Sequence, residues 1–96
     1  MTKMIDKIRK WANKNKYCIV PENNYYGDIY IGLVNAYKNI YIDLTNEKIY
    51  LYLRIYDNCI MTQSQVDKLQ IEFNNLMRDG KEVKELIGDN YEIKRN

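Results

Sequence analysis

Residues 40–57, IYIDLTNEKIYLYLRIYD, decide the fold of this 96-residue chain because two neighbouring runs within them alternate in character. The first run is aliphatic at Ile40, Ile42 and Leu44, and the second run repeats the alternation after a polar interruption. A period of two is typical of a β-strand that buries one face. The interruption, TNEK at residues 45–48, predicts a tight turn although it lacks the favoured Asn-Gly pair. The stretch therefore predicts a β-hairpin.

The register of this hairpin follows from its turn. If Asn46 and Glu47 form the loop, Ile42 lies opposite Leu51 and all the aliphatic side chains share one face. The opposite face then carries Tyr41, Asp43, Tyr50, Tyr52, Arg54 and Tyr56. On that face we expect Tyr41 to lie directly across from Tyr52.

A basic amphipathic helix is predicted over residues 2–15. Its apolar residues recur at helical spacing and form one stripe, made of Met4, Ile5, Ile8, Trp11 and Ala12. The remaining surface carries cations, namely Lys3, Lys7, Arg9, Lys10 and Lys14. We expect a solvated face here, and contact with phosphate or an acidic partner is the alternative.

Two short segments follow this helix. Residues 17–20 predict a strand that ends at Pro21, because proline cannot donate to a β-ladder. Residues 22–28, ENNYYGD, predict a loop from their Asn and Gly content. Loops carry much of the binding function of proteins, so Tyr25 and Tyr26 are candidate contact residues.

Residues 29–37 predict a further strand, joined to the central hairpin by a turn near residues 38–39. Its aliphatic face is expected to continue that of the hairpin, through Ile29, Ile31 and Leu33. Its other face adds to the tyrosine side of the sheet, through Tyr30, Gly32, Val34 and Ala36.

A second helix is predicted from Thr62, where Thr62 and Gln65 match a capping box. Its apolar stripe consists of Val66, Leu69, Phe73, Leu76 and Met77. Asp79 and Gly80 resemble a helix stop, but the stripe continues through Val83. The pattern therefore leaves one long helix or two short ones open, followed by a tail at residues 91–96.

These elements predict one domain, residues 1–96, of the α+β class. The expected architecture has two layers, an antiparallel three- to four-stranded sheet with helices packed on one face, in α-β-β-β-β-α order. The apolar stripes of both helices must pack against another apolar surface, and the aliphatic face of the sheet is the only large one available. The tyrosine face is then left open.

Composition excludes several functions. The net charge of +2 is too small to predict nucleic acid or an anionic membrane as a partner. The chain has no histidine, the commonest general base and a frequent zinc ligand. We therefore expect no cofactor, no metal and no catalytic residue. An enzyme would require a carboxylate pair that the linear sequence does not show.

The cysteines and the hydropathy pattern indicate a cytoplasmic protein. Cys18 and Cys59 have neither metal-ligand nor redox-pair spacing, so we expect buried, reduced thiols, with a disulfide between them as the alternative. No apolar run approaches the about 20 residues that span a bilayer. The N-terminus lacks the apolar core of a signal peptide.

The tyrosine content is the main indication of function. The chain has ten tyrosines against one phenylalanine and one tryptophan, although abundant Asn, Lys, Ile and Tyr are also typical of an AT-rich genome. Tyrosine and arginine are enriched at interface hot spots. The open face therefore predicts a protein-binding surface, centred on Tyr41, Asp43, Tyr50, Tyr52, Arg54 and Tyr56, with Tyr25 and Tyr26 as a second patch.

Three alternatives remain for this face. It is an ordinary exposed ladder of cross-strand pairs, a platform on which single-stranded nucleic acid stacks its bases, or the contact of a homodimer. The element order also resembles the double-stranded RNA-binding domain. That family carries a lysine cluster at the start of its last helix, which residues 62–68, TQSQVDK, do not supply.

The N-terminal third resembles the small phage-encoded anti-CRISPR inhibitors, through IDKIR at residues 5–9, Asn13, Lys14 and Tyr17 and through the order of elements that follows. The resemblance implies a phage or mobile-element protein that inhibits a host defence complex. The best-known members are strongly acidic, whereas this chain is mildly basic. We therefore expect steric blockade of a host protein in the cytoplasm of the host cell rather than mimicry of nucleic acid.

Overall fold

A computed structural model of the chain describes residues 2–53 and 62–95, without the side chains of residues 2 and 21–25. Two helices and five strands are present in this part. They are α1 (Thr2–Lys14), β1 (Cys18–Tyr25), β2 (Asp28–Val34), β3 (Lys38–Asp43), β4 (Lys48–Leu53), α2 (Gln63–Ile87) and β5 (Glu92–Arg95). The α+β class is confirmed.

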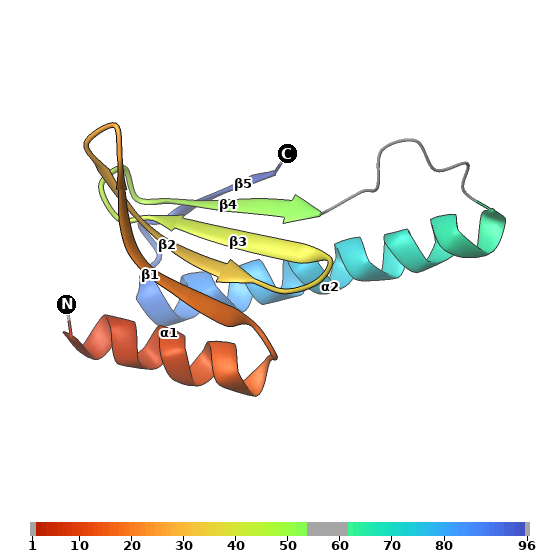
Figure 1. The fold of residues 1–96 in the computed structure, drawn as a ribbon, viewed down its shortest axis with the longest axis horizontal. Coiled ribbons are helices and arrows are strands. Elements are labelled where there is room, and N and C mark those ends of the chain that lie inside the picture. Colours follow the sequence, from red (N-terminus) through yellow and green to blue (C-terminus); the bar gives the residue numbers. More distant parts are fainter. Residues whose placement is uncertain (1, 54–61, 96) are drawn as a thin grey trace.

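The five strands form one mixed sheet in the order β1-β2-β3-β4-β5 (Figure 1). Strands β1 to β4 are an antiparallel meander, as predicted, but β5 pairs with β4 in parallel. The prediction of a purely antiparallel sheet with three to four strands was therefore incomplete. The tail becomes a fifth strand because α2 carries the chain back along the sheet, so that it re-enters in the direction of β4.

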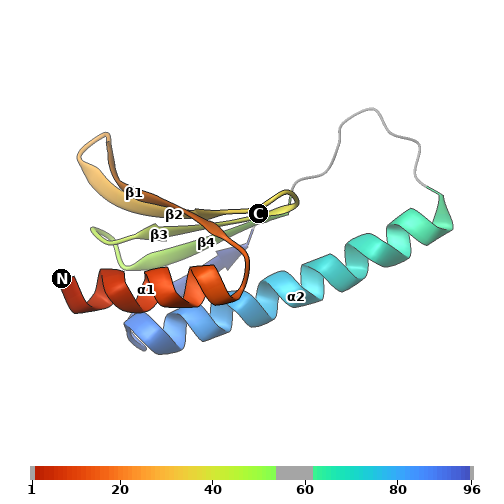
Figure 2. The ribbon, with the colours of Figure 1, turned by 60° about the horizontal axis from the view of Figure 1, so that its bottom comes forward.

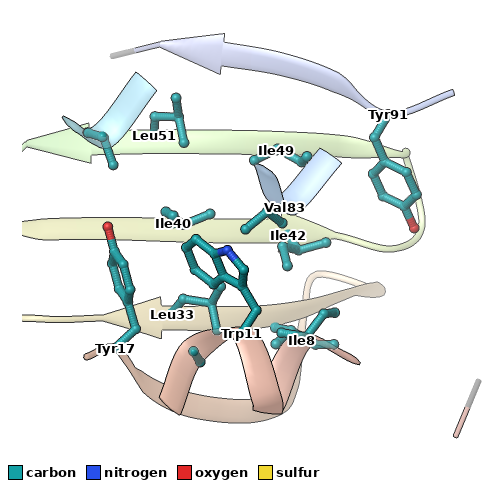
Figure 3. Close-up of a cluster of buried hydrophobic side chains, with 13 residues drawn as sticks. Ile8, Trp11, Tyr17, Leu33, Ile40, Ile42, Ile49, Leu51, Val83 and Tyr91 are labelled. Atoms are coloured by element: carbon teal, nitrogen blue, oxygen red, sulfur yellow. The ribbon is translucent and has the colours of Figure 1, made fainter. Parts of the chain in front are cut away.

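Both helices pack on the same face of the sheet, as the sequence predicted (Figure 2). Between them and the sheet lies an apolar core, in which strand residues of one face meet the helix stripes (Figure 3). Its fully buried members include Ile8, Ile31, Leu33, Ile40, Ile42, Ile49, Leu51, Leu76 and Val83. The aliphatic face expected from the alternation is thus the buried one.

The register of the central hairpin differs from the expected one by two residues. Ile42 pairs with Ile49 and Ile40 with Leu51, and the connection spans residues 44–47. The Asp43 carboxylate stabilises this wider turn by accepting hydrogen bonds from two backbone N–H groups within it, at 3.0 Å each. Because the shift is an even number of residues, every side chain keeps its predicted face.

The prediction of a loop at residues 22–28 was wrong, because most of this segment belongs to strand β1. The strand continues through Pro21 to Tyr25, with a register irregularity between Val20 and Asn23. A missing N–H is tolerated there because β1 is an edge strand. The hairpin to β2 then turns at Tyr26 and Gly27, both of which adopt positive φ, the conformation that a two-residue hairpin loop requires.

Strand β2 is shorter than predicted. It ends at Val34, and the turn to β3 lies at residues 35–37 rather than near residues 38–39. Asn35 explains the shift, because its side-chain oxygen accepts hydrogen bonds from the N–H groups of Tyr37 and Lys38. Asparagine commonly forms such a local turn.

Helix α2 is one continuous helix and not two short helices separated at Gly80. The predicted capping box at Thr62 and Gln65 is present at its start. Gly80 lies where the helix crosses the sheet, and a Cβ added there would meet both δ-carbons of Leu51 at 2.9 Å. Glycine at this position therefore permits close packing instead of ending the helix.

Helix α2 is also longer than the sheet that it covers. Its 25 residues span about 37 Å at 1.5 Å per residue, whereas the six residues of β4 span about 20 Å. The N-terminal half consequently projects beyond the strands (Figures 1 and 2). Its buried residues, Leu76, Asp79, Gly80 and Val83, all lie in the other half.

Candidate partner-binding face

The face of the sheet opposite the helices carries four tyrosines from three adjacent strands. We define the tyrosine face as Tyr30, Tyr41, Tyr50 and Tyr52 together with the smaller residues between them, Cys18, Val20, Gly32, Val34 and Asn39. Strand pairing brings these residues into rows, since Tyr41 lies between Gly32 and Tyr50 while Asn39 lies between Val34 and Tyr52. The predicted clustering of Tyr41, Tyr50 and Tyr52 on one face is confirmed by this placement.

The ring of Tyr41 is fixed in the middle of the tyrosine face. It packs over Gly32, where an added Cβ would lie 3.5 Å from the ring. The Tyr52 ring meets the Tyr41 ring edge-on, with ring centroids 5.4 Å apart. The Asn39 side-chain amide donates a hydrogen bond to the Tyr41 hydroxyl at 3.1 Å. The expected pair of Tyr41 and Tyr52 is therefore in contact, but diagonally, because the strand partner of Tyr41 is Tyr50.

Asp43 does not belong to the exposed surface, contrary to the prediction. Its side chain is fully buried at 0% exposure. Besides the two backbone N–H groups of the turn, it accepts a hydrogen bond from the Asn46 amide at 2.9 Å. A carboxylate occupied in this way organises the β3–β4 turn and is not free to contact a partner.

The neighbouring Tyr30 is a neutral hydroxyl at physiological pH. Partial burial, followed by the adjacent Asp43 and Asp28 carboxylates, raises the pKa of the Tyr30 phenol above its ordinary value. Both effects disfavour a phenolate. Tyr30 therefore presents an aromatic ring with a hydrogen-bonding tip to this side of the sheet.

Charged side chains lie at the β5 margin of the tyrosine face. Glu92 makes ion pairs with Lys94 at 2.8 Å and with Lys48 at 4.0 Å. The Lys94 hydrogen bond and its positive charge lower the pKa of Glu92, and Glu92 in turn raises the pKa of Lys94. The cations that border the face on this side are thus already paired with a carboxylate.

The remaining predicted contact residues are Tyr25, Tyr26, Arg54 and Tyr56. Tyr26 lies at the tip of the β1–β2 hairpin and is 91% exposed, whereas Tyr25 pairs with Asp28 at the end of β1. Arg54 and Tyr56 lie outside the described residues, as does Cys59. Cys18 is an exposed free thiol on β1, which makes the prediction of a buried side chain wrong for this cysteine.

Sequence reasoning missed a buried polar cluster between the helices and the β2–β3 end of the sheet. The Tyr17 hydroxyl donates a hydrogen bond to Asp79 at 2.7 Å, and the Lys38 ammonium lies 3.3 Å from Glu72 and 3.9 Å from Asp79. Burial and the Asp79 carboxylate raise the pKa of the Tyr17 phenol. Because its members come from distant parts of the chain, no local pattern indicated the cluster.

This cluster has a structural explanation. It joins the segment after α1, the start of β3 and the middle of α2, and nearby the Trp11 indole N–H donates to Glu82 at 3.0 Å.

Among the described residues, no three His, Cys, Asp or Glu side chains are placed to hold a metal ion. In the same part of the chain no helix is long and apolar enough to cross a membrane.

Comparison with known proteins identified no similar protein. No protein-family model matches the chain, and no curated protein or solved structure shows significant similarity to it. The tyrosine face must therefore be interpreted from its own chemistry.

Proposed function

We propose that the chain is a non-enzymatic protein-binding module that contacts its partner through the tyrosine face. The observation that carries the proposal is the arrangement of the sheet, whose two helices both cover the aliphatic side. In the described part of the chain no helix or strand lies over the side of the sheet opposite the two helices (Figure 2). Strand register places Tyr41, Tyr50 and Tyr52 on that side. An aromatic surface of this kind on a small domain commonly marks an interaction site.

The distribution of charge on the tyrosine face supports a protein partner. Tyrosine rings and small residues occupy the middle, and the ion-paired residues Lys48, Glu92 and Lys94 lie at one margin. Protein interfaces have the same anatomy, with few charges in the core, enrichment in tyrosine and a polar rim. Tyr41 is also held by its neighbours, which reduces the entropy lost when a partner binds.

Single-stranded nucleic acid suits this face less well. Base stacking requires aromatic rings together with free cations that follow the backbone. Both lysines at the β5 margin are instead paired with Glu92. A homodimer through the same face remains an outcome that the experiment below distinguishes.

The resemblance of residues 5–17 to anti-CRISPR inhibitors extends the proposal to a biological role. In that role the chain comes from a phage or other mobile element, and it inhibits a host defence complex in the cytoplasm by steric blockade. The mild positive charge favours occlusion of a protein surface over imitation of nucleic acid.

The test compares the proteins that the tagged 96-residue chain and two variants of it capture from host lysate, with and without nuclease treatment. The Tyr50→Ala/Tyr52→Ala double variant removes two face residues, and Tyr37→Ala is the matched control, since Tyr37 is an exposed tyrosine in the β2–β3 turn. We expect one protein to be captured by the wild type and by the control. The double variant should bind this protein with at least about 30-fold lower affinity, equivalent to about 2 kcal/mol.

Two results would contradict the proposal. One is unchanged affinity in a double variant whose circular dichroism matches the wild type. The other is capture that disappears when nucleic acid is digested and that the double variant also loses, which would favour base stacking on this face. Concentration-dependent self-association lost only in the double variant would instead assign the face to a homodimer.

A further inference from the structure

Helix α1 has a larger net positive charge than the whole, nearly neutral protein. It contains five cations and one acid, a net charge of +4, among its 13 residues. The other 83 residues contain ten cations and twelve acids, a net charge of −2. The overall value of +2 therefore conceals a strongly basic helix on an otherwise acidic chain.

Four of these cations form a straight row along α1. Lys3, Lys7, Lys10 and Lys14 recur at intervals of four, three and four residues, which places them within an arc of about 60° at 100° per residue. The row is about 16 Å long at a rise of 1.5 Å per residue. We call these four residues the lysine row.

The lysine row is free to meet a ligand. All four side chains are exposed, because the apolar side of the helix, with Ile8, Trp11 and Ala12, is the side that packs into the core (Figure 3). No ion pair among the described residues includes a cation of α1. The lysines at the β5 margin, by contrast, are ion-paired to Glu92.

We propose that the lysine row binds the phosphate backbone of double-stranded nucleic acid without reading its sequence. A rigid helix with one lysine per turn is complementary to an evenly charged polyanion, in which each strand carries one phosphate per about 3.4 Å of axis. Lysine contacts phosphate as a point charge. Base edges are read by arginine, asparagine and glutamine as well as by lysine, and the row contains lysine alone.

Other anionic partners match the row less well. A surface-bound amphipathic helix inserts its apolar face into the membrane, but that face of α1 is buried in the core. Single strands are held largely by stacking on aromatic rings, and the one aromatic residue of α1, Trp11, is only 9% exposed and packs on Tyr17. The regular spacing of charge along a duplex remains the best complement.

The test measures binding of the full chain to a fluorescent DNA duplex of arbitrary sequence, of about 20 base pairs, between about 50 and 200 mM salt. Four phosphate contacts predict a slope of log affinity against log salt of about −3.6, a loss of about 150-fold over this range. Lys7→Gln/Lys10→Gln should reduce the slope to about −1.8 and the loss to about 12-fold. Glutamine keeps the helix propensity of lysine, so the variant is expected to fold.

The matched control is Lys81→Gln/Lys84→Gln on α2, which changes the net charge equally and should keep the wild-type slope. Equal weakening by both double variants would overturn the proposal, because binding would then follow net charge alone. So would the absence of duplex binding at 50 mM salt, or tighter binding to phosphatidylserine vesicles or to the single strand than to the duplex. The row shares no residue with the tyrosine face, so either proposal can fail alone.

Discussion

Replacing Gly80 by alanine tests the packing of α2 on the sheet. Two effects oppose each other at this position. Alanine in a helix interior is more favourable than glycine by about 1 kcal/mol. However, the new Cβ would lie 2.9 Å from both δ-carbons of Leu51, a side chain that is itself 2% exposed and held in the core.

Because Leu51 has little room to move, we expect the packing effect to prevail. Forcing an additional methyl group into a packed core costs about 1–3 kcal/mol, so the net change in the free energy of unfolding should be a loss of about 1 kcal/mol. A surface helix would show a gain instead. The sign of the change is therefore decisive.

Urea denaturation monitored by fluorescence of Trp11, the single tryptophan, measures this change. The transition midpoint should fall while the slope with denaturant stays constant. Gly80→Ala should also be tested together with Leu51→Val, which removes both δ-carbons from the contact and costs about 1 kcal/mol by itself. In that background the alanine should become neutral or stabilising, and the difference between the two backgrounds measures the coupling.

A more stable Gly80→Ala protein in the wild-type background would refute this reasoning. It would mean that α2 does not approach β4 closely enough for Gly80 to matter. Equal effects of the alanine in both backgrounds would lead to the same conclusion, because the contact with Leu51 would then be absent.

Two further variants test other parts of the fold. Tyr17→Phe should lower the free energy of unfolding by about 1–3 kcal/mol at neutral pH, because Asp79 loses a buried hydrogen-bond donor. The folded-state pKa of Tyr17 is raised, so its stabilisation is complete below the unfolded pKa of about 10 and declines as the pH rises beyond it. Urea titrations on both sides of about pH 10 should show a shallower decline in Tyr17→Phe, and equal declines would contradict the assignment. Gly88→Ala should cost about 1–3 kcal/mol, seen as a lower Tm, since φ of 137° and ψ of 146° at the end of α2 are accessible essentially to glycine alone. An unchanged Tm would show that the helix end has another conformation.

The sequence by itself determined which side chains share a face. Alternation of period two assigns Ile40 and Ile42 to one side of a strand and Tyr41 to the other, whatever the partner strand is. The two-residue error in register therefore left the aliphatic core and the tyrosine face unchanged. Helical spacing similarly identified the buried stripe of α1, because both patterns depend only on local backbone geometry.

Contacts between distant segments were decided by the tertiary structure alone. Gly80 has the local signature of a helix stop, but the approach of α2 to Leu51 gives it a packing role. Asp43 has the pattern of an exposed strand residue, yet the turn that follows occupies its carboxylate and buries it. The parallel pairing of β5 and the contact of Tyr17 with Asp79 likewise depend on where α2 crosses the sheet. Local sequence does not encode that position, because it follows from the packing of the whole core.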